Sequence, residues 1–435
     1  MRIGFLSGAL PYLPSVGGFR IYGSNLIRSL SKHHEIDLIT LLWPEDAEHL
    51  SWPATFCASV STVSCNRPRL PMRFANFISA YFCGKQLHYR KALRAKIFEG
   101  LKSRDWDIVH VEGPLMAGLL PLDFPLPKVV SVHDSWALRC KEMLQCSHNL
   151  REKSYYTILR YMQPRYERLV YTRYERCVVV ANPDKRALER TAPHCNISVI
   201  SNGTDTEYYR PLAVEKSEKT LVFHGHLGYA PNVEAAIECA HEILPRIRRV
   251  IPDAALHLVG ADPAPAVQRL ASGKGIKVSA NLADLRKAVC AGQIYVGPIL
   301  HGNGIKNKIL EAMAMQMPIV VYPAAVTGID CIDGKHLLIA RNRAEFAAHT
   351  IKLMQTPAYA DQLARAGRAL VEQHYSWEAR GQAYEELYRQ VIEEWQVRQR
   401  ISPGSIHPPN ESQVAGSLSA SSVPRMTSTA NGIPR

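Results

Sequence analysis

Residues 301–314 read HGNGIKNKILEAMA, and residues 318–322 read PIVVY. The first run predicts a glycine-rich loop that enters a helix, and the second predicts a short buried strand. Glycine lets a backbone approach a ligand closely, and the start of a helix offers unpaired N–H groups with a partial positive charge. Lys306 and Lys308 add two full charges at that point. The stretch therefore indicates an α/β unit in which the start of a helix can hold an anion.

Glu311 follows one turn inside this expected helix, where its carboxylate can accept hydrogen bonds from hydroxyl groups. A ligand with a phosphate at one end and a polyol at the other matches both features, and a nucleotide sugar is such a ligand. Lysines in the first turn of a helix can also belong to a solvated face. On this run alone, phosphate binding and a solvated face are equally open.

The size and the cysteines of the chain narrow its class. Its 435 residues predict two or three domains with full hydrophobic cores. The ten cysteines form no CxxC pair and no cluster with histidine, which indicates reduced thiols, a cytoplasmic location and no structural zinc. The first apolar run is too short for a secretory signal. The longest uncharged run, 312–329, contains Pro318 and Pro323, which indicates a core segment rather than a membrane span.

The net charge of +13 is concentrated in residues 66–104, where ten basic residues face one acid and phenylalanines and tyrosines are interleaved. Such a surface can bind an anionic membrane or an acidic substrate, or it can be a solvated basic face. Nucleic-acid binding is disfavoured because no recognition motif accompanies the charge.

Short apolar runs alternate with amphipathic stretches almost throughout, as in parallel strands that are buried on both faces. The expected strands of the first half are 3–7, 36–41, 108–111, 129–133, 178–181 and 198–201, and those of the second half are 220–224, 255–259, 276–279, 294–296, 319–322 and 337–339. Helices are expected at 24–32, 233–250, 284–290, 307–315, 344–354, 358–372 and 376–398. The predicted fold class is α/β, with two doubly wound, Rossmann-like domains that face an interdomain cleft.

The break between the two series predicts an N-terminal domain over 1–205 and a second domain over 206–375. A long helix is expected over 376–398. Beyond it, residues 399–435 are rich in proline, serine and threonine and lack apolar periodicity, so this tail is expected to be disordered.

Ligands bind outside the carboxyl ends of parallel strands, and this rule selects candidate residues. His133 closes the expected strand 129–133 and can reach a sugar or a phosphate, although a purely structural histidine is the alternative. Gly17 and Gly18 precede the first helix and suit a close ligand approach, or an ordinary loop. Asp105 and Asp107 resemble a metal-binding Asp-x-Asp, but they precede their strand and lie at the wrong edge of the sheet. No metal is expected.

Several motifs fall in order along the chain: Gly17-Gly18, His133-Asp134, ISNGTD (200–205), FHG (223–225), PN (231–232), LVG (258–260), DL (284–285), KNKILEAMA (306–314) and YSW (375–377). With these motifs the chain resembles the retaining glycosyltransferases of family 4, which have the GT-B architecture. The resemblance covers residues 1 to about 395 and is densest between 220 and 377.

The resemblance implies roles for individual residues. Glu311 would bind the ribose of a nucleotide sugar, and the backbone around Lys306, Asn307 and Lys308 would hold the diphosphate. His133 would contact the transferred sugar or its phosphate, so His133 and Lys306 are the expected catalytic residues. The full expected donor-binding set is Gly17, Gly18, Gly225, Asn232, Asn303, Gly304, Lys306, Asn307, Lys308 and Glu311. Gly18 would close over the diphosphate from the first domain, and the last helix would return to that domain.

The chain departs from the family pattern at two places. The family often has a glutamate eight positions before Glu311, where this chain has Asn303. The frequent arginine and lysine after the first strand of the second domain are also absent, since residues 225–232 read GHLGYAPN. Lys306 is expected to supply the missing charge.

The implied function is transfer of a sugar, with retention, from a nucleotide diphosphate sugar to a hydroxyl of a sugar, glycan or lipid-linked acceptor. No cofactor is implied. A role in cell-surface polysaccharide or glycolipid synthesis is expected, with residues 66–104 meeting an anionic membrane from the cytoplasmic side. Two alternatives stay open: a nucleotide-sugar epimerase, which would convert the donor unaided, and a non-catalytic nucleotide-sugar-binding protein.

Overall fold

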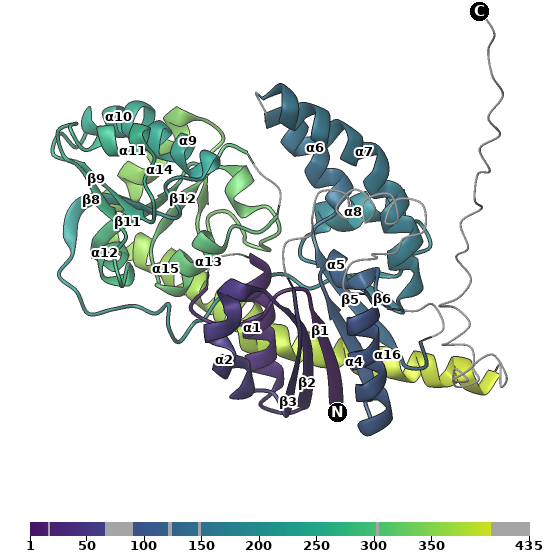
Figure 1. Cartoon of the computed structure of the whole chain (residues 1–435). Coiled ribbons are helices and arrows are strands. Elements are labelled where there is room, and N and C mark those ends of the chain that lie inside the picture. Colours follow the sequence, from purple (N-terminus) through teal and green to yellow (C-terminus); the bar gives the residue numbers. More distant parts are fainter. Residues whose placement is uncertain (16–17, 66–89, 121–123, 147–148, 302–303, 402–435) are drawn as a thin grey trace, which may run out of the picture.

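The computed structural model describes residues 1–15, 18–65, 90–120, 124–146, 149–301 and 304–401. It has two parallel sheets with helices packed around each, so the predicted α/β fold class is confirmed (Figure 1). The first sheet has the order β3-β2-β1-β4-β5-β6-β7. Its strands are β1 (Arg2–Ser7), β2 (Glu35–Leu42), β3 (Ser59–Ser64), β4 (Ile108–Glu112), β5 (Lys128–His133), β6 (Arg176–Val179) and β7 (Ile197–Val199).

The helices of this first, N-terminal domain connect successive strands. They are α1 (Gly18–Leu30), α2 (Ser51–Ala54), α4 (Arg90–Ser103), α5 (Pro114–Ala117), α6 (Trp136–Cys146), α7 (Leu150–Val170) and α8 (Asn182–Thr191), with 3-10 turns at Pro44–His49 and Tyr171–Arg173. Helices α6 and α7 form an antiparallel hairpin that projects from the domain (Figure 1).

The second sheet has the order β10-β9-β8-β11-β12-β13. Its strands are β8 (Ser217–His224), β9 (Ala255–Gly260), β10 (Ile276–Ala280), β11 (Gly292–Gly297), β12 (Ile319–Val321) and β13 (Leu338–Ile339). Its helices are α9 (Ala230–Ile237), α10 (Leu244–Arg248), α11 (Pro265–Leu270), α12 (Arg286–Ala291), α13 (Asn307–Ala314), α14 (Arg343–Gln355) and α15 (Pro357–His374), with a π segment at Glu238–Ile243 and a 3-10 turn at Pro323–Val326.

Both sheets reverse their strand order at the first strand, which places a crevice at that point of each sheet. Strand β1 lies between β2 and β4, and β8 lies between β9 and β11. In open parallel sheets, ligands bind in this crevice, beyond the carboxyl ends of the strands. Ser7 and Glu112 end β1 and β4, and His224 and Gly297 end β8 and β11.

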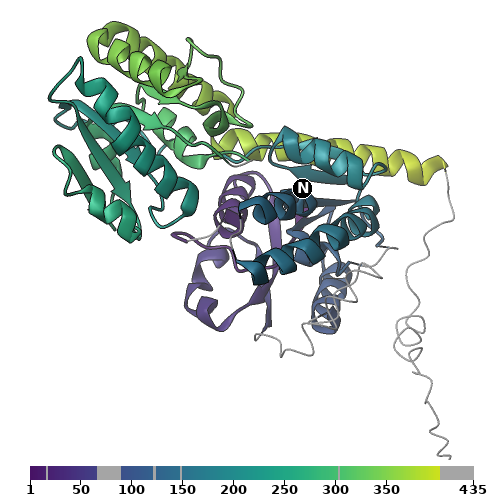
Figure 2. The ribbon, with the colours of Figure 1, turned by 90° about the horizontal axis from the view of Figure 1, so that it is seen from above.

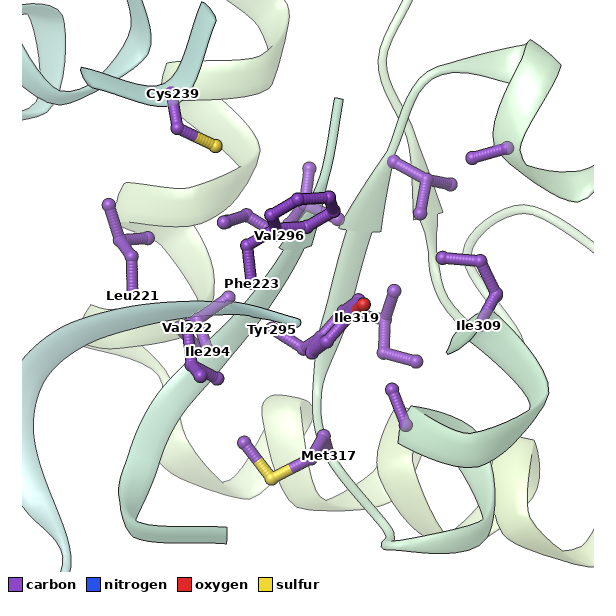
Figure 3. Close-up of a cluster of buried hydrophobic side chains, with 14 of the residues drawn as sticks. Leu221, Val222, Phe223, Cys239, Ile294, Tyr295, Val296, Ile309, Met317 and Ile319 are labelled. Atoms are coloured by element: carbon purple, nitrogen blue, oxygen red, sulfur yellow. The ribbon is translucent and has the colours of Figure 1, made fainter. Parts of the chain in front are cut away.

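Continuous apolar strands build the core of the second domain. Phe223 of β8 and Tyr295 of β11 are fully buried, and Ile309 of α13 packs into the same cluster (Figure 3). Burial of apolar surface on both faces of the sheet is the main stabilising contribution, at roughly 25 cal/mol per Å². The start of α13 is thereby fixed against β11 and β12.

Helix α16 (Trp377–Ile401) belongs to the core of the N-terminal domain, along which it runs in Figure 2. Trp377, Tyr384 and Tyr388 pack there with residues of β1 and α1. Ser376 caps the helix by accepting a hydrogen bond from the Ala379 amide at 3.1 Å. The chain crosses between the domains twice, and the crossings are paired: Thr204 N–H donates to the Tyr375 carbonyl at 2.7 Å.

Some elements differ from those expected. Strand β3 is not among the expected strands, and α1 begins at Gly18 rather than at residue 24. Helices α2, α4 to α8 and α11 lie between strands, where helices are expected, but the sequence predicts no bounds for them. The expected helix 233–250 begins at Ala230 and contains the π segment, which ends where Pro245 provides no N–H for regular α-helical bonding. Trp106 Nε1 donates to Asp37 at 2.9 Å, and Asp107 accepts from the Arg2 amide, so the Asp-x-Asp stretch has structural contacts at the amino edge.

Two further features bear on the sequence expectations. Eight cysteines in the described part of the chain are free thiols, namely Cys57, Cys65, Cys140, Cys177, Cys195, Cys239, Cys290 and Cys331. Among the described residues, none of the helices combines the length and the apolar character that crossing a bilayer requires. Residues 66–89 of the basic segment and residues 402–435 of the expected tail lie outside the described residues.

Candidate functional site

The first turn of α13 lies at the carboxyl edge of the second sheet and faces the N-terminal domain. Asn307 accepts a hydrogen bond from the side chain of Asn202, in the first crossing, at 3.1 Å. Lys306 has extended backbone just before the helix, and its Nζ donates to the Gly304 carbonyl at 2.7 Å. Asn303, which the sequence singled out, lies outside the described residues, as does Gly17.

Lys308 supplies the ammonium group nearest the loop that follows β8. Its Nζ donates to Oδ1 of Asn232, whose Nδ2 in turn donates to the His226 carbonyl at 2.8 Å. A Cβ atom on Gly225 would lie only 3.2 Å from this Nζ. From the sequence, Lys306 is expected to replace the arginine and lysine that the family often has in this loop. In the structure, Lys308 is the lysine beside the loop.

Glu311 is paired rather than free. Its Oε2 lies 2.8 Å from Nε2 of His224, a histidine that is 1% exposed at the end of β8. The imidazole fixes one carboxylate oxygen, while a fifth of the Glu311 side chain stays accessible. A carboxylate held in this way can accept hydrogen bonds from a pair of hydroxyl groups.

Two glycines bring backbone segments into direct contact beside this site. A Cβ atom on Gly260 would lie 1.7 Å from the Gly225 carbonyl oxygen, and both residues have positive φ angles, of 159° and 152°. No residue with a side chain fits at Gly260 in this backbone arrangement. Main-chain atoms at the ends of β8 and β9 thus line the region beside Lys308 and Glu311.

Burial lowers the pKa of both lysines. It lowers the pKa of Lys308 to about 8 and the pKa of Lys306 to about 8. The carboxylates of Glu142, Asp134 and Asp184, all in the N-terminal domain, partly oppose this shift at Lys306. An anion bound at this point would raise the pKa of both lysines again.

His133 faces this region from the N-terminal domain. Its φ of 63° is unusual for a residue with a side chain, and the pairing of β5 with β6 shifts register at this point. Nε2 lies 2.5 Å from Oε1 of Glu112, and the rings of Phe19 and Tyr22 pack within 4.4 Å between centroids. Gly18, the first residue of α1, has open space where a Cβ would be.

Comparison with known families identifies the family to which this fold belongs. A family described as "Glycosyl transferases group 1" matches residues 218–356, and one described as "Glycosyltransferase Family 4" matches residues 16–208. The chain belongs to the group 1 glycosyltransferases.

Solved structures with the same fold span nearly the whole glycosyltransferase. Sucrose-phosphate synthase from Thermosynechococcus elongatus is 18% identical, with a TM-score of 0.62 over 90% of this chain and 99% of that one. Anabaena HepE in complex with UDP and glucose is 14% identical, with a TM-score of 0.60 over 90% and 100% of the two chains. At these identities the likeness shows the shared GT-B fold.

One curated relative comes from Klebsiella pneumoniae and is described as an "Uncharacterized 44.6 kDa protein in cps region". It is 23% identical over 163 residues, which are 36% of this chain and 42% of the relative. The match thus spans less than half of that protein.

Sequence reasoning missed several residues of this glycosyltransferase that lie at the same strand ends. Glu112 ends β4 and His224 ends β8, and both are the direct partners of residues that were selected. The rule that selected His133, a polar residue at the carboxyl end of a parallel strand, applies to both of them. Among the described residues there is no group of histidine, cysteine and acidic side chains that could hold a metal ion.

Proposed function

We propose that this glycosyltransferase moves a sugar from a nucleotide diphosphate sugar to an acceptor hydroxyl, with retention at the anomeric carbon and without a metal ion. The observation that carries the proposal is the meeting of Lys308, Asn232 and the His224–Glu311 pair at the crevice of the second sheet. The HepE structures hold UDP, glucose or UDP-glucose, which supports a donor of that class here.

In this proposal the diphosphate lies at the start of α13. Lys308 and Lys306 provide the positive charge, and the N–H groups of the first helical turn provide hydrogen bonds. A charge-assisted hydrogen bond contributes roughly 1.5–3 kcal/mol. Glu311 binds the ribose hydroxyls with the carboxylate that His224 orients.

The chemical step breaks the bond between the anomeric carbon and the leaving phosphate oxygen and forms one to the acceptor oxygen. The acceptor proton passes to the leaving phosphate oxygen, so the mechanism needs no side-chain base. Fixed donors and the two ammonium groups stabilise the charge that develops on the diphosphate. His133, from the opposite domain, contacts the transferred sugar or its phosphate.

The acceptor is proposed to be lipid-linked and presented at the cytoplasmic face of a membrane. Helix α7 supports this part of the proposal, because Leu150, Ile158 and Tyr161 are more than half exposed along its outward side. Arg151 and Arg165 lie on the same helix. An apolar helix face flanked by basic residues suits the surface of an anionic membrane.

A thermal-shift screen of nucleotide sugars in EDTA, followed by product analysis, tests the catalytic proposal. A ligand at 100 times its Kd stabilises the native state by about 2.7 kcal/mol. Transfer to an acceptor with retention supports the proposal. Conversion of the donor alone identifies an epimerase, and binding without turnover on any acceptor identifies a binding protein.

Sedimentation with phosphatidylglycerol vesicles tests the membrane part separately. The full chain is expected to sediment with these vesicles and not with phosphatidylcholine vesicles. The double variant Ile158→Glu, Tyr161→Glu is expected to stay in solution. Val250→Glu, which changes an exposed residue of the other domain, is the control and should still bind. Equal binding of both variants would contradict the role of α7.

A further inference from the structure

A buried chain of hydrogen bonds joins His133 to the last helix. Nε2 of His133 lies 2.5 Å from Oε1 of Glu112, and Oε2 of Glu112 lies 3.1 Å from Nε2 of His110. Nδ1 of His110 lies 2.7 Å from the hydroxyl of Tyr388, on α16. Glu112 is 2% exposed, and His110 and Tyr388 are fully buried. These hydrogen bonds thus begin at the carboxyl end of β5 and end on a helix that follows the whole second domain in sequence.

The positions of the hydrogens in this series of hydrogen bonds follow from the protonation states of Glu112 and Tyr388. Burial alone would raise the pKa of Glu112, but the attraction of both imidazoles outweighs it and the pKa is lowered. An ionised carboxylate accepts only, so both histidines donate from Nε2. Burial raises the pKa of Tyr388, which keeps its hydroxyl protonated and able to donate to Nδ1 of His110.

This pattern leaves one nitrogen of His133 for a ligand. Nδ1 bonds to none of the residues that the structure describes, and about a tenth of the side chain remains accessible. With the hydrogen on Nε2, Nδ1 of a neutral ring is an acceptor and can take a hydrogen bond from a sugar hydroxyl. The opposite tautomer would present a donor instead.

We propose that Glu112 is a positioning residue that keeps the hydrogen of His133 on Nε2 and presents Nδ1 to the sugar-transfer site, and that Tyr388 of α16 positions His110 on the other side of the same carboxylate. The inference rests on the proposed function for what Nδ1 contacts. The predicted tautomer of His133 does not depend on that function, because it is a property of the protein without a ligand. Helix α16 is thereby joined, through Tyr388 and His110, to the carboxylate that orients His133.

Replacement of the carboxylate by an amide gives a specific expectation. In Glu112→Gln, the side-chain oxygen accepts hydrogen bonds, whereas the side-chain NH₂ group only donates them. We expect Tyr388 to continue to donate to Nδ1 of His110, which leaves the His110 hydrogen on Nε2 and turns the amide oxygen toward it. The amide NH₂ group then faces His133, whose ring must accept at Nε2 and carry its hydrogen on Nδ1.

The test is NMR of the full chain labelled with ¹⁵N-histidine, because the shifts of the two ring nitrogens report the tautomer. His133 is identified by the signal that His133→Gln removes. The wild type is expected to show the hydrogen on Nε2, and Glu112→Gln is expected to move it to Nδ1. A wild-type hydrogen on Nδ1, or no change in Glu112→Gln, overturns the proposal whatever reaction the enzyme catalyses.

A second arm isolates the contribution of α16. In the Glu112→Gln background, Tyr388→Phe frees His110 to change tautomer, so part of the His133 population should return to Nε2–H. Tyr384→Phe is the matched control, since Tyr384 lies one turn earlier on the helix and bonds to Tyr22 at 2.7 Å instead. An equal response to both substitutions overturns the role of Tyr388.

Kinetics complete the test. Glu112→Gln is expected to lower kcat by roughly 10- to 100-fold while the donor KM changes less than about 3-fold, because Lys306, Lys308 and Glu311, which are proposed to hold the diphosphate and the ribose, lie in the other domain. UDP binding by calorimetry should be unchanged. A tautomer change with unchanged kcat overturns the link to sugar transfer. If the wild type transfers no sugar, the proposed function fails while the NMR result stands by itself.

Discussion

Nε2 of His224 lies 2.8 Å from Oε2 of Glu311 and ties the end of β8 to helix α13. The N-terminal domain has the same kind of pair, formed by Glu112 and His133 at the ends of β4 and β5. Each domain therefore has a carboxylate hydrogen-bonded to an imidazole at the ends of its strands, and Glu112 also contacts His110. In the second domain we propose that the carboxylate of Glu311 contacts the ligand, and in the first domain we propose that the imidazole of His133 does so.

Loss of the carboxylate in Glu311→Gln is expected to weaken UDP binding by at least about 10-fold, or about 1.4 kcal/mol, because an amide presents only one acceptor to the ribose. Isothermal titration calorimetry measures the change. Glu234→Gln, on the exposed surface of α9, is the control. Unchanged affinity in Glu311→Gln would contradict the ribose assignment.

Nucleotide binding is expected to take up protons near pH 8. Lys306 and Lys308 each have a pKa of about 8 in the free chain, and a bound diphosphate raises both values. Roughly one proton in total should be taken up per UDP at pH 8, and affinity should fall between pH 7 and 9.5. Calorimetry in two buffers of different ionisation enthalpy measures the uptake, which Lys308→Met should reduce.

The same two lysines also predict how the free energy of unfolding changes with pH. Because their folded pKa values lie below the unfolded value, the unfolded chain holds more protons between about pH 8 and 10.5. These two groups therefore destabilise the free chain below pH 8, and this effect is lost as the pH rises through the window. Lys308→Met should show a smaller rise in unfolding free energy there than the wild type.

The backbone of His133 predicts a difference between two truncations. Because its φ of 63° suits glycine, His133→Gly should be more stable than His133→Ala by about 1 kcal/mol, although glycine usually destabilises. Urea unfolding of the two variants measures the difference. A less stable glycine variant would show that the loop relaxes out of this conformation.

Gly381 lets α16 cross α1 closely. A Cβ atom there would lie 2.1 Å from Oγ and 2.9 Å from Cβ of Ser29. Gly381→Ala should thus cost about 1–3 kcal/mol despite the better helix propensity of alanine. Gly23→Ala, where the nearest atom is 3.9 Å away, is the control and should be neutral or stabilising. Thermal unfolding of both variants gives the comparison.

Much of the fold is predictable because the central strands are continuous apolar runs, which fit only a sheet buried on both faces. Strand β3 is the exception: it reads SVSTVS and lies at a sheet edge, where burial on both faces is not required. Helix α7 contains Pro164, and several of its apolar residues, such as Ile158 and Tyr161, are exposed rather than buried. Its tertiary contacts, rather than its local sequence, therefore define it.

The candidate site was only partly predictable. Lys308 and Glu311 stand in a recognisable run, whereas the partners of the site come from distant segments. His110 and Tyr388 are 278 positions apart, and nothing local marks either residue. A pairing of this kind becomes visible only when the topology brings β4 and α16 together.

The paired crossing at Thr204 and Tyr375 has a consequence for biosynthesis. The N-terminal domain is discontinuous in sequence, since its core includes Trp377, Tyr384 and Tyr388. During translation, domains form in the order in which they leave the ribosome. The second domain can close as soon as it emerges, but the first must wait with an uncovered apolar face until α16 is made. The domain synthesised first is thus the last to be completed.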